Sequence, residues 1–499
     1  MNAKSTCDRF AWWPAVAVLT LAGLVLRIAA AARGGLWTDE AWSMVYAQQA
    51  RDPLGVFLRI NHDNNHHLNS LWMQAVGMHA SPLLVRAPAI LAGTLTIPAA
   101  ALLFARRSAA GAIAAAALFA LSPMMVTYGS EARGYSSMML AALIMMRLVT
   151  DEIDGRNGRF NPLLGALIAA LGMLSNLTML APVVLLTLWI YLERRSSIGS
   201  AKAVRSAIAI MGPALIASVA VLLLVLAAAM ASRTGLQVGG YTPFSFHGYA
   251  VALANLTGWT AGLTFRTEWL AIIALAGIGV AVFVRAPSAI GPRARLYGLL
   301  ILGVPVVVAA ERTGNAQFAR YYLCSAIGLL LLGAEWIEQS IKADRTQRAL
   351  CAIACGLFLV TAFWRDGQLI ELGRGQPDRA IRLMADEAPR GARVGIDTYQ
   401  LTAPMIVAAK EAGYPVSLAG PCAPAQFMIV AREAHSMRTA TRCGHPMQEI
   451  GWSEAPDLTG DSWVLYRAEG FQSAGHIDTG PAPTAENRRI SGRAGVAQG

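Results

Sequence analysis

The chain has 499 residues, of which 55% are hydrophobic and 14% are charged, and its mean hydropathy is +0.46. Soluble globular proteins rarely combine such values, so the composition excludes a soluble fold and predicts a polytopic α-helical membrane protein. The net charge of +11 is explained by Arg and Lys near the ends of apolar runs and in the C-terminal tail, and it gives no support for nucleic-acid binding.

About eleven apolar runs are long enough to cross a membrane as helices. Arg and Lys are about three times denser in one set of connecting segments, and the positive-inside rule therefore places that set and the N-terminus in the cytoplasm. The first loop, 33–82, and everything after 364 are then expected outside. The expected spans are 13–32, 84–104, 109–127, 134–149, 161–175, 177–192, 206–230, 268–284, 297–310, 321–338 and 349–364.

Three parts of the chain follow from this pattern. Residues 1–364 are the expected transmembrane domain. Residues 365–470 are an expected small α/β domain, because 392–418 has the pattern strand, helix, strand, with Gly413 where the helix would stop. Residues 471–499 are polar and contain Pro and Gly, which is typical of a disordered tail.

The compartment is expected to be a bacterial cytoplasmic membrane. The first span lacks a small-residue cleavage site and is expected to be retained, and the Ala- and Arg-rich composition suits a GC-rich bacterium. Cys422 and Cys443 fall in the outer, extracytoplasmic domain, where an oxidising compartment allows either a disulfide or two free thiols.

Two adjacent carboxylates, Asp39 and Glu40, stand in "WTDEAW" directly after the first span. A solvated helix N-terminus is the purely structural interpretation of this pair, with Thr38 or Asp39 as the cap. The functional interpretation is a general base at the membrane surface. Two tryptophans, Trp37 and Trp42, flank the pair as interface anchors or as a platform for a sugar.

Arginines gather at the same outer level of the expected bundle: Arg27, Arg86, Arg133 and Arg320. Arg133 shares the turn "YGSEARGYSS" with Glu131. Each arginine near a span end has a structural alternative as a snorkelling anchor. Together they predict a phosphate site, because guanidinium groups bind phosphate oxygens in pairs and keep their charge when partly buried.

A polar cluster, "RINHDNNHHLNSLWMQ", follows in the first loop. His62 and His66 have the i, i+4 spacing of metal ligands, but only one carboxylate lies nearby. The Asn-rich setting favours hydrogen bonds to a hydroxylated ligand, so we expect no required metal or other cofactor, with a divalent metal kept as the alternative. The long outer loop 231–267 is a further candidate for an acceptor cleft.

Four segments carry a resemblance to a known family: "LRIAAAARGGLWTDEAWS", "NNHHLNSLW", "YGSEARGYSSMML" and "FARYYLCSAIGLLLL". In this order they resemble the motifs of GT-C glycosyltransferases that use polyprenyl-phosphate sugars, the group of the family 39 protein mannosyltransferases and the lipid A aminoarabinose transferases. The resemblance covers roughly residues 20–335. His67 departs from it, because the family usually has Pro at this position.

The resemblance implies a GT-C fold and an inverting transfer at the outer membrane face, from a polyprenyl-phosphate sugar to a hydroxyl of a glycan, lipid or protein. Asp39 is the implied base and Glu40 its support. The expected donor and phosphate site consists of Arg27, Arg86, Glu131, Arg133, Tyr135, Arg320 and Tyr321. The expected sugar or acceptor site consists of Asn65, His66 and His67.

Elementary chemistry agrees with this activity. A lipid phosphate is already a good leaving group, so the reaction needs one base and cations that neutralise the departing phosphate, and a metal is optional. Two alternatives remain: a flippase for polyprenyl-linked sugars, which needs a basic path through the membrane, and a non-catalytic envelope polysaccharide assembly protein, which depends on the outer domain. The sugar, the acceptor and the pathway stay open.

Overall fold

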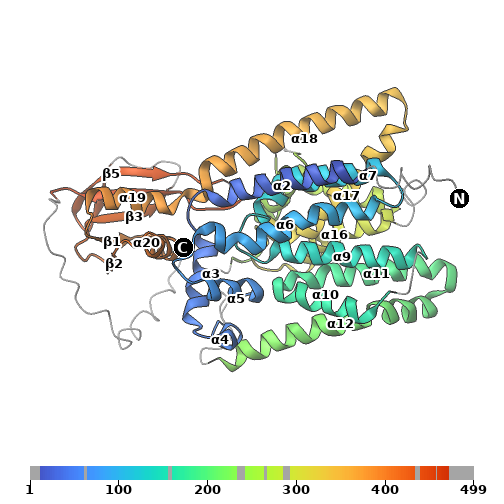
Figure 1. The fold of residues 1–499 in the computed structure, drawn as a ribbon, viewed down its shortest axis with the longest axis horizontal. Helices are drawn as coiled ribbons and strands as arrows, with labels where there is room; N and C mark the ends of the chain where they lie inside the picture. Colours follow the sequence, from blue (N-terminus) through green and yellow to red (C-terminus); the bar gives the residue numbers. More distant parts are fainter. Residues whose placement is uncertain are drawn as a thin grey trace.

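The computed structural model describes residues 12–60, 64–155, 160–232, 242–262, 267–284, 293–432, 439–456 and 458–470. Within them the molecule has two parts, an elongated bundle of helices lying alongside one another and a sheet domain at one end of the bundle (Figure 1). Helix α2 begins at the far end of the bundle, and the short helix α3 lies where the bundle meets the sheet domain (Figure 1). The expected disordered tail, 471–499, lies outside the described residues.

Each expected span falls largely on helical residues, but 109–127 is divided at Ser122 into α7 and α8, and 177–192 and 321–338 begin in the short helices η2 and η3. Seven helical segments of the described chain are long and apolar enough to cross a membrane, and three shorter apolar helices add to them. The number of crossings stays a prediction. The bundle helices are α2 (Trp13–Ala32), α6 (Pro82–Phe104), α7 (Ala109–Leu121), α8 (Pro123–Tyr128), α9 (Tyr135–Ile153), α10 (Pro162–Ser175), η2 (Leu177–Met179), α11 (Leu180–Ile198), α12 (Ser200–Ala231), α13 (Phe246–Ala261), α14 (Trp269–Val284), α16 (Arg293–Glu311), η3 (Ala319–Tyr322), α17 (Leu323–Ile341) and α18 (Arg345–Leu372).

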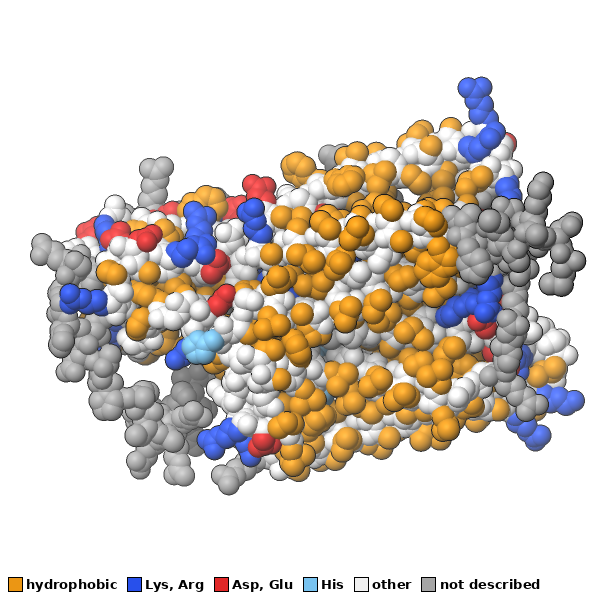
Figure 2. Space-filling view, in the orientation of Figure 1, with side chains coloured by type: hydrophobic (Ala, Val, Ile, Leu, Met, Phe, Trp, Pro, Cys, Tyr) orange, Lys and Arg blue, Asp and Glu red, His pale blue; other side chains and the backbone are white. Residues whose placement is uncertain are grey.

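The side of the bundle is apolar. Figure 2 shows hydrophobic side chains spread over the length of the helices, whereas acidic and basic side chains gather at the two ends. Leu163 is 78% exposed and Met230 is 73% exposed on this surface. Such a surface is stable in lipid, where helices are favoured because each satisfies its own backbone hydrogen bonds. The protein is therefore a multi-pass membrane protein, as predicted.

Small residues allow close packing at the end of the bundle that meets the sheet domain. Gly93 of α6 faces the turn 129–134 that joins α8 to α9, and a Cβ at Gly93 would lie 2.6 Å from the Cα of Gly129. Contacts of this kind allow close backbone approach where lipid gives no hydrophobic driving force between helices. The close approach brings the turn with Glu131 and Arg133 against the bundle.

The first loop is structured. It contains α3 (Thr38–Gln49), α4 (Pro53–Leu58) and α5 (His67–Val76). One apolar cluster joins this loop to the bundle, to the turn 129–134 and to the sheet domain: Leu36, Ala41, Met44, Val45, Ala47, Met73, Val85, Ala132, Ala403 and Val407. The first loop is therefore packed against the bundle, the turn 129–134 and the sheet domain.

The segment 231–267 is not the open loop that the sequence suggested. It contains α13, whose Tyr249 is buried and donates a hydrogen bond to the carbonyl of Pro305 over 3.1 Å. The ring of Tyr249 also lies 6.1 Å from that of Tyr322. The helix thus belongs to the bundle, and the sequence analysis missed it because polar residues such as His247 and Asn255 interrupt its apolar run.

The described residues of the sheet domain form six strands in the order β2-β1-β3-β6-β5-β4. Strand β1 pairs in parallel with β2 and β3, and the remaining pairs are antiparallel. The predicted strand–helix–strand unit is confirmed, whereas β4, β5 and α19 were missed because their sequences are polar. The elements are α19 (Pro377–Glu387), β1 (Ala392–Ile396), η5 (Tyr399–Leu401), α20 (Thr402–Glu411), β2 (Val416–Ala419), β3 (Phe427–Ala431), β4 (Thr439–Arg442), β5 (His445–Ser453) and β6 (Trp463–Ala468).

The connection between bundle and sheet domain is sharply bent. Helix α18 continues past the expected boundary at 364 and ends at Leu372, where η4 (Gly373–Gly375) begins. Residues 373–376 all have positive φ, including Arg374 at 57°. Gly375 allows a close approach, because a Cβ there would lie 1.9 Å from the carbonyl oxygen of Asp461. The bend folds the sheet domain back onto the first loop.

A disulfide joins Cys422 to Cys443, with their Cα atoms 5.4 Å apart. Cys422 follows the edge strand β2, and Cys443 lies in the β4–β5 turn at the other edge of the sheet. The bond therefore ties together the two edges of the domain. A disulfide of this kind persists in oxidising compartments.

We expect Cys422→Ser to lower the free energy of unfolding of the sheet domain by about 3 kcal/mol, the loop-closure value for a loop of this length. Thermal unfolding of the purified protein with and without reductant measures it. Reductant should lower the midpoint of the wild type and of Cys355→Ser, but not that of Cys422→Ser. An unchanged wild-type midpoint after the bond is demonstrably reduced would contradict the expectation.

Candidate active site

Helix α3 places Asp39 and Glu40 in its first turn, where carboxylates interact favourably with the helix dipole. Adjacent residues on a helix point about 100° apart. Glu40 is therefore turned into the protein and is fully buried, whereas the Asp39 side chain is 22% exposed. The two carboxylates have different environments and different tasks.

Asp39 lies between two arginines. Its Oδ2 is 2.7 Å from Nη1 of Arg133 and 2.7 Å from Nη1 of Arg320. Burial by itself would raise the pKa of Asp39, but the charges of Arg133 and Arg320 more than offset this effect and leave the pKa below its usual value. The structure thus brings together three residues that are far apart in the sequence, as an ionised group at the outer end of the bundle.

Arg133 is held from behind by His66. Its Nε donates to Nε2 of His66 over 3.0 Å, so this ring nitrogen carries no proton. Burial, and then the charge of Arg133, keep the pKa of His66 well below its ordinary value. The other ring nitrogen lies 3.3 Å from the carbonyl oxygen of Ser175. His66, expected at the sugar or acceptor site, is therefore a neutral support of Arg133.

The two neighbours of His66 are placed differently. His67 is buried, its ring stacks on Phe57 at 5.0 Å between centroids, and burial lowers its pKa to about 4. Asn65 is only partly buried, but its Oδ1 is inaccessible and without a partner among the described residues. Of the three expected acceptor residues, Asn65 and His67 each keep a buried polar atom, Oδ1 and Nδ1, without a partner among the described residues.

Glu40 and Arg86 form a separate, fully buried pair. Arg86 donates from Nε to Oε1 over 2.9 Å and from Nη2 to Oε2 over 2.5 Å. The same guanidinium donates to the carbonyls of Ala31 and Gly35 over 2.8 and 2.9 Å, and the amide of Ala132 donates to Glu40 over 2.6 Å. The pair joins α3, α6 and the turn 129–134, and its donors are used within the protein.

Arg27 is also engaged inside the bundle. It is fully buried in α2, and its guanidinium donates to the carbonyls of Phe119 and Gly23 over 3.0 Å each and to that of Ala120 over 3.3 Å. Phe119 and Ala120 are near the C-terminal end of α7, where carbonyls lack partners within the helix. Arg27 therefore caps a helix instead of joining the Asp39 group.

Oε1 of Glu131 and the hydroxyl of Tyr135 are two of the buried polar atoms that have no partner among the described residues. The Tyr135 ring lies edge-on to His66 at 4.8 Å. Burial raises the pKa of Glu131 to about 7, against the opposing charge of Arg133. Since buried polar groups are normally paired, these two atoms are candidates for contacts to a ligand.

An apolar groove of about 540 Å³ runs along α11 and α16 and reaches η3, next to Arg320. Tyr321 lines it, and the Arg320 guanidinium carbon lies 5.7 Å from the Tyr321 ring centroid. Further lining residues include Leu185, Val304, Val307, Val308 and Leu323. The groove therefore leads from the lipid-facing helices to η3, where Tyr321 lines it next to Arg320 in the chain.

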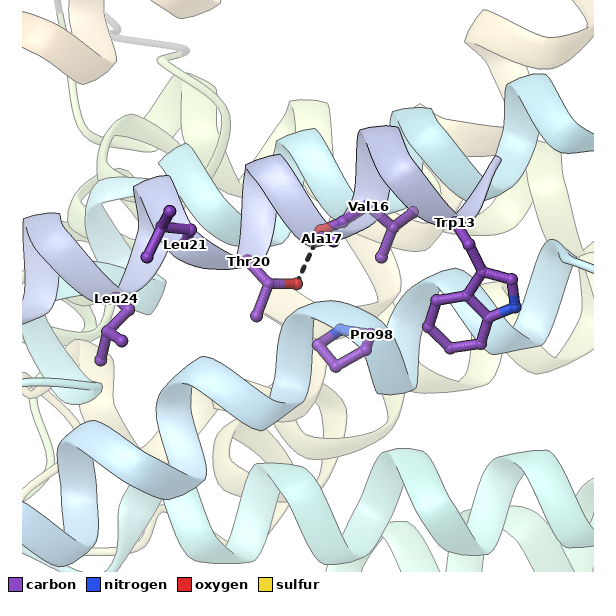
Figure 3. A pocket seen from close by; sticks show the side chains of 7 residues that line it. All are labelled: Trp13, Val16, Ala17, Thr20, Leu21, Leu24 and Pro98. Atoms are coloured by element: carbon purple, nitrogen blue, oxygen red, sulfur yellow. Dashed lines mark hydrogen bonds between the residues drawn. The ribbon is translucent and has the colours of Figure 1, made fainter. Parts of the chain in front are cut away.

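A second hollow, of about 380 Å³, lies between α2 and α6, where Pro98 interrupts α6 (Figure 3). Its walls are apolar side chains and Thr20, whose hydroxyl donates to the carbonyl of Val16 over 2.7 Å. It contains no charged residue, so it offers space for a lipid chain and no chemistry.

Sequence reasoning missed Arg374. This buried residue donates to the carbonyl of Ala30 over 2.9 Å and to the hydroxyl of Ser130 over 2.8 Å. The local sequence feature that could have drawn attention to Arg374 is its place between two glycines in "GRGQP", where the backbone is left-handed. Arg374 fastens the start of the outer domain to the turn that carries Arg133.

Among the described residues no three His, Cys, Asp or Glu side chains are grouped as metal ligands would be. His62 lies outside the described residues, so the metal alternative of the sequence stays untested. The charged side chains in contact at this site are one carboxylate and two arginines.

The sequence matches no protein-family model and no curated protein. Among solved structures, the chain is similar to apo ArnT from Cupriavidus metallidurans, with a TM-score of 0.51 and 12% identity over 90% of this chain and 97% of that one. ArnT bound to undecaprenyl phosphate gives a TM-score of 0.46 at 12% identity over the same shares. The Archaeoglobus fulgidus oligosaccharyltransferase in complex with Zn and sulfate gives 0.48 at 12% identity, over 84% of this chain and 68% of that one. The likeness to apo ArnT shows that the chain has the GT-C fold, which the sequence resemblance had implied.

The pKa of Glu131 generates a test. Because the folded protein holds this proton up to about pH 7, the carboxyl destabilises the fold increasingly as pH rises from the usual pKa toward 7. We expect Glu131→Gln, which keeps the neutral shape, to unfold a few degrees above the wild type at about pH 8.5 and together with it at about pH 5. Thermal unfolding at both values measures this, with Glu152→Gln on the opposite side of the bundle as control. An equal difference at both pH values would contradict the assignment.

Proposed function

We propose that this protein is a membrane glycosyltransferase that moves a sugar from a polyprenyl-phosphate donor to a hydroxyl acceptor, with inversion at the anomeric carbon. The observation that carries the proposal is the Asp39 carboxylate between Arg133 and Arg320, together with an apolar groove that reaches Tyr321, the neighbour of Arg320. A lipid-linked phosphate sugar needs an apolar channel, cations and one base at the same place.

The donor fits this arrangement part by part. The polyprenyl chain lies in the groove between α11 and α16, and its phosphate meets Arg320 at η3. Arg133 and Arg320 bind the phosphate oxygens, as guanidinium groups do where charge is partly desolvated. Glu131 and Tyr135 supply polar atoms for the sugar hydroxyls.

The arginines link donor binding to the strength of the base. Paired with Arg133 and Arg320, Asp39 has a lowered pKa and is a poor proton acceptor. A bound phosphate competes for the same guanidinium groups and weakens their hold on Asp39. Asp39 then becomes more basic when the donor is in place. It therefore removes the acceptor's proton when a sugar is available for transfer.

In the transfer step the acceptor hydroxyl gives its proton to Asp39, and its oxygen forms the new bond to the anomeric carbon. The bond between that carbon and the phosphate oxygen breaks, and polyprenyl phosphate leaves with the electron pair, its charge balanced by Arg133 and Arg320. Glu40 and Arg86 position Asp39 and Arg133, because their hydrogen bonds hold α3 against the turn that carries Arg133. Attack opposite to the leaving group inverts the sugar.

We place the reaction on the outer face of a bacterial cytoplasmic membrane. The distribution of Arg and Lys puts the first loop outside, and the Cys422–Cys443 disulfide in the domain packed on that loop is typical of an oxidising compartment. The acceptor is a glycan, lipid or protein that approaches from this side, where Asp39 is exposed.

The base is tested with Asp39→Asn. We expect the release of polyprenyl phosphate from a panel of polyprenyl-phosphate sugars, by lipid-reconstituted protein with a membrane extract as acceptor source, to fall by roughly 10²–10⁴-fold. Asp52→Asn is the matched control, because Asp52 is an exposed first-loop carboxylate that caps α4 and pairs with Arg59. Full turnover by Asp39→Asn would refute the assignment. Donor transport without release by the wild type would favour the flippase.

The groove is tested by a pair of neighbours on α16. Val307 lines the groove, whereas Val306 is equally exposed, at 58%, but is not part of the groove lining. We expect Val307→Trp to raise the KM for the donor about tenfold because the indole fills space needed by the chain, and Val306→Trp to leave it within about twofold. Steady-state kinetics with a long-chain donor and a short-chain analogue measure the effect. Equal KM values for the two variants would argue against this path.

A further inference from the structure

The residue before α3 supplies no side-chain cap, although the Glu40 carboxylate accepts a hydrogen bond from the amide of Trp37 over 3.4 Å. Trp37 stands at the N-cap position, where Ser, Thr, Asp or Asn would normally supply an oxygen to the free amides. Instead the amide of Thr38 donates to Oδ2 of Asp461 over 2.8 Å. Asp461 lies just before β6 in the outer domain, 423 residues further along the chain.

Other outer-domain oxygens receive hydrogen bonds from the same short segment. The hydroxyl of Thr38 donates to the carbonyl of Gln400 over 3.1 Å, and the amide of Gly35 donates to Oδ1 of Asp378 over 2.9 Å. Three oxygens from separate parts of the outer domain thus hold the four residues that precede Asp39. The carbonyl of Gly35 also accepts a hydrogen bond from Arg86 over 2.9 Å, so the bundle and the sheet domain both hold this segment.

Apolar contacts extend this hold along α3. Ala41 and Val45 share a buried cluster with Ala403 and Val407 of α20. This packing orients the helix and includes Leu36 of the preceding segment, whereas the backbone amide of Thr38 is held by its hydrogen bond to Asp461. Of the three acceptors in the outer domain, Asp461 is the one whose charged side chain binds a backbone amide of the first turn.

Asp461 is itself tied back to the bundle. Its amide donates to the carbonyl of Arg374 over 3.4 Å, and the Arg374 guanidinium donates to Ser130 in the turn that carries Arg133. The path therefore runs from Asp39 through Thr38 and Asp461 to Arg374 and returns to Arg133. It braces both sides of the Asp39–Arg133 ion pair.

We propose that Asp461 is a positioning residue for the Asp39 carboxylate, and that the outer domain is therefore part of the active site through the cap it places on α3. The catalytic meaning of this role rests on the proposed function, whereas the capping itself does not. Loss of the cap frees the amides of the first turn, which then frays, and Asp39 is the second residue of that turn. The Asp461 carboxylate, when ionised, also complements the positive end of the helix dipole.

Three variants test the proposal: Asp461→Ala removes the acceptor, Asp461→Asn keeps an acceptor oxygen, and Asp386→Ala removes an exposed carboxylate of α19 as the control. Hydrogen exchange of the reconstituted full-length protein reads out capping without any need for activity. We expect amide exchange in the peptide spanning residues 36–44 to rise roughly tenfold in Asp461→Ala and to stay within about twofold of the wild type in the other two.

Kinetics read out positioning. We expect kcat of Asp461→Ala to fall roughly tenfold with the donor KM within about twofold, and Asp461→Asn to recover most of kcat. Unchanged exchange in residues 36–44 of Asp461→Ala would overturn the proposal, as would unchanged kcat despite faster exchange. If the wild type transfers no sugar while exchange responds as expected, the proposed function fails and the capping role stands.

Discussion

The buried ion pair between Glu40 and Arg86 is the constraint on which the outer end of the molecule depends. A carboxylate without water is stable only when its charge and both oxygens are satisfied, and Glu40 meets this requirement with two donors from Arg86 and one from the amide of Ala132. These three bonds fix the rotation of α3 relative to α6 and to the turn 129–134. Because Asp39 is the preceding residue on the same helix, that rotation decides where its carboxylate points.

The neighbouring ion group works under the opposite condition. Asp39, Arg133 and Arg320 are partly exposed, and one carboxylate oxygen is shared by two cations. Such an arrangement keeps an excess positive charge at the end of an apolar groove, where an anion with an apolar tail is stabilised by both features. The neutral His66 behind Arg133 adds no further charge, since burial beside an arginine keeps its pKa low.

The connection at residues 373–376 joins these charges to the outer domain. Four successive residues with positive φ turn the chain sharply, which glycine tolerates and Arg374 sustains with hydrogen bonds to Ala30 and Ser130. The bend brings the outer domain onto α3, and the apolar cluster that contains Ala41 and Ala403 closes the contact. The α/β domain that the sequence predicted after residue 364 is thus packed against the helix that carries the candidate base.

The amino-acid sequence alone predicted the membrane class, most of the helix positions and the C-terminal strand–helix–strand unit, because apolar length and residue periodicity act locally. It also singled out Asp39, Arg133 and Arg320 among the charged residues near span ends, and the structure brings these three side chains into contact. Only the tertiary structure decided that Glu40 and Arg86 face each other, that Arg27 caps α7, and that Asp461 reaches Thr38. Partners of this kind are chosen by packing between segments distant in the chain, and no local pattern of residues encodes which buried charge will meet which.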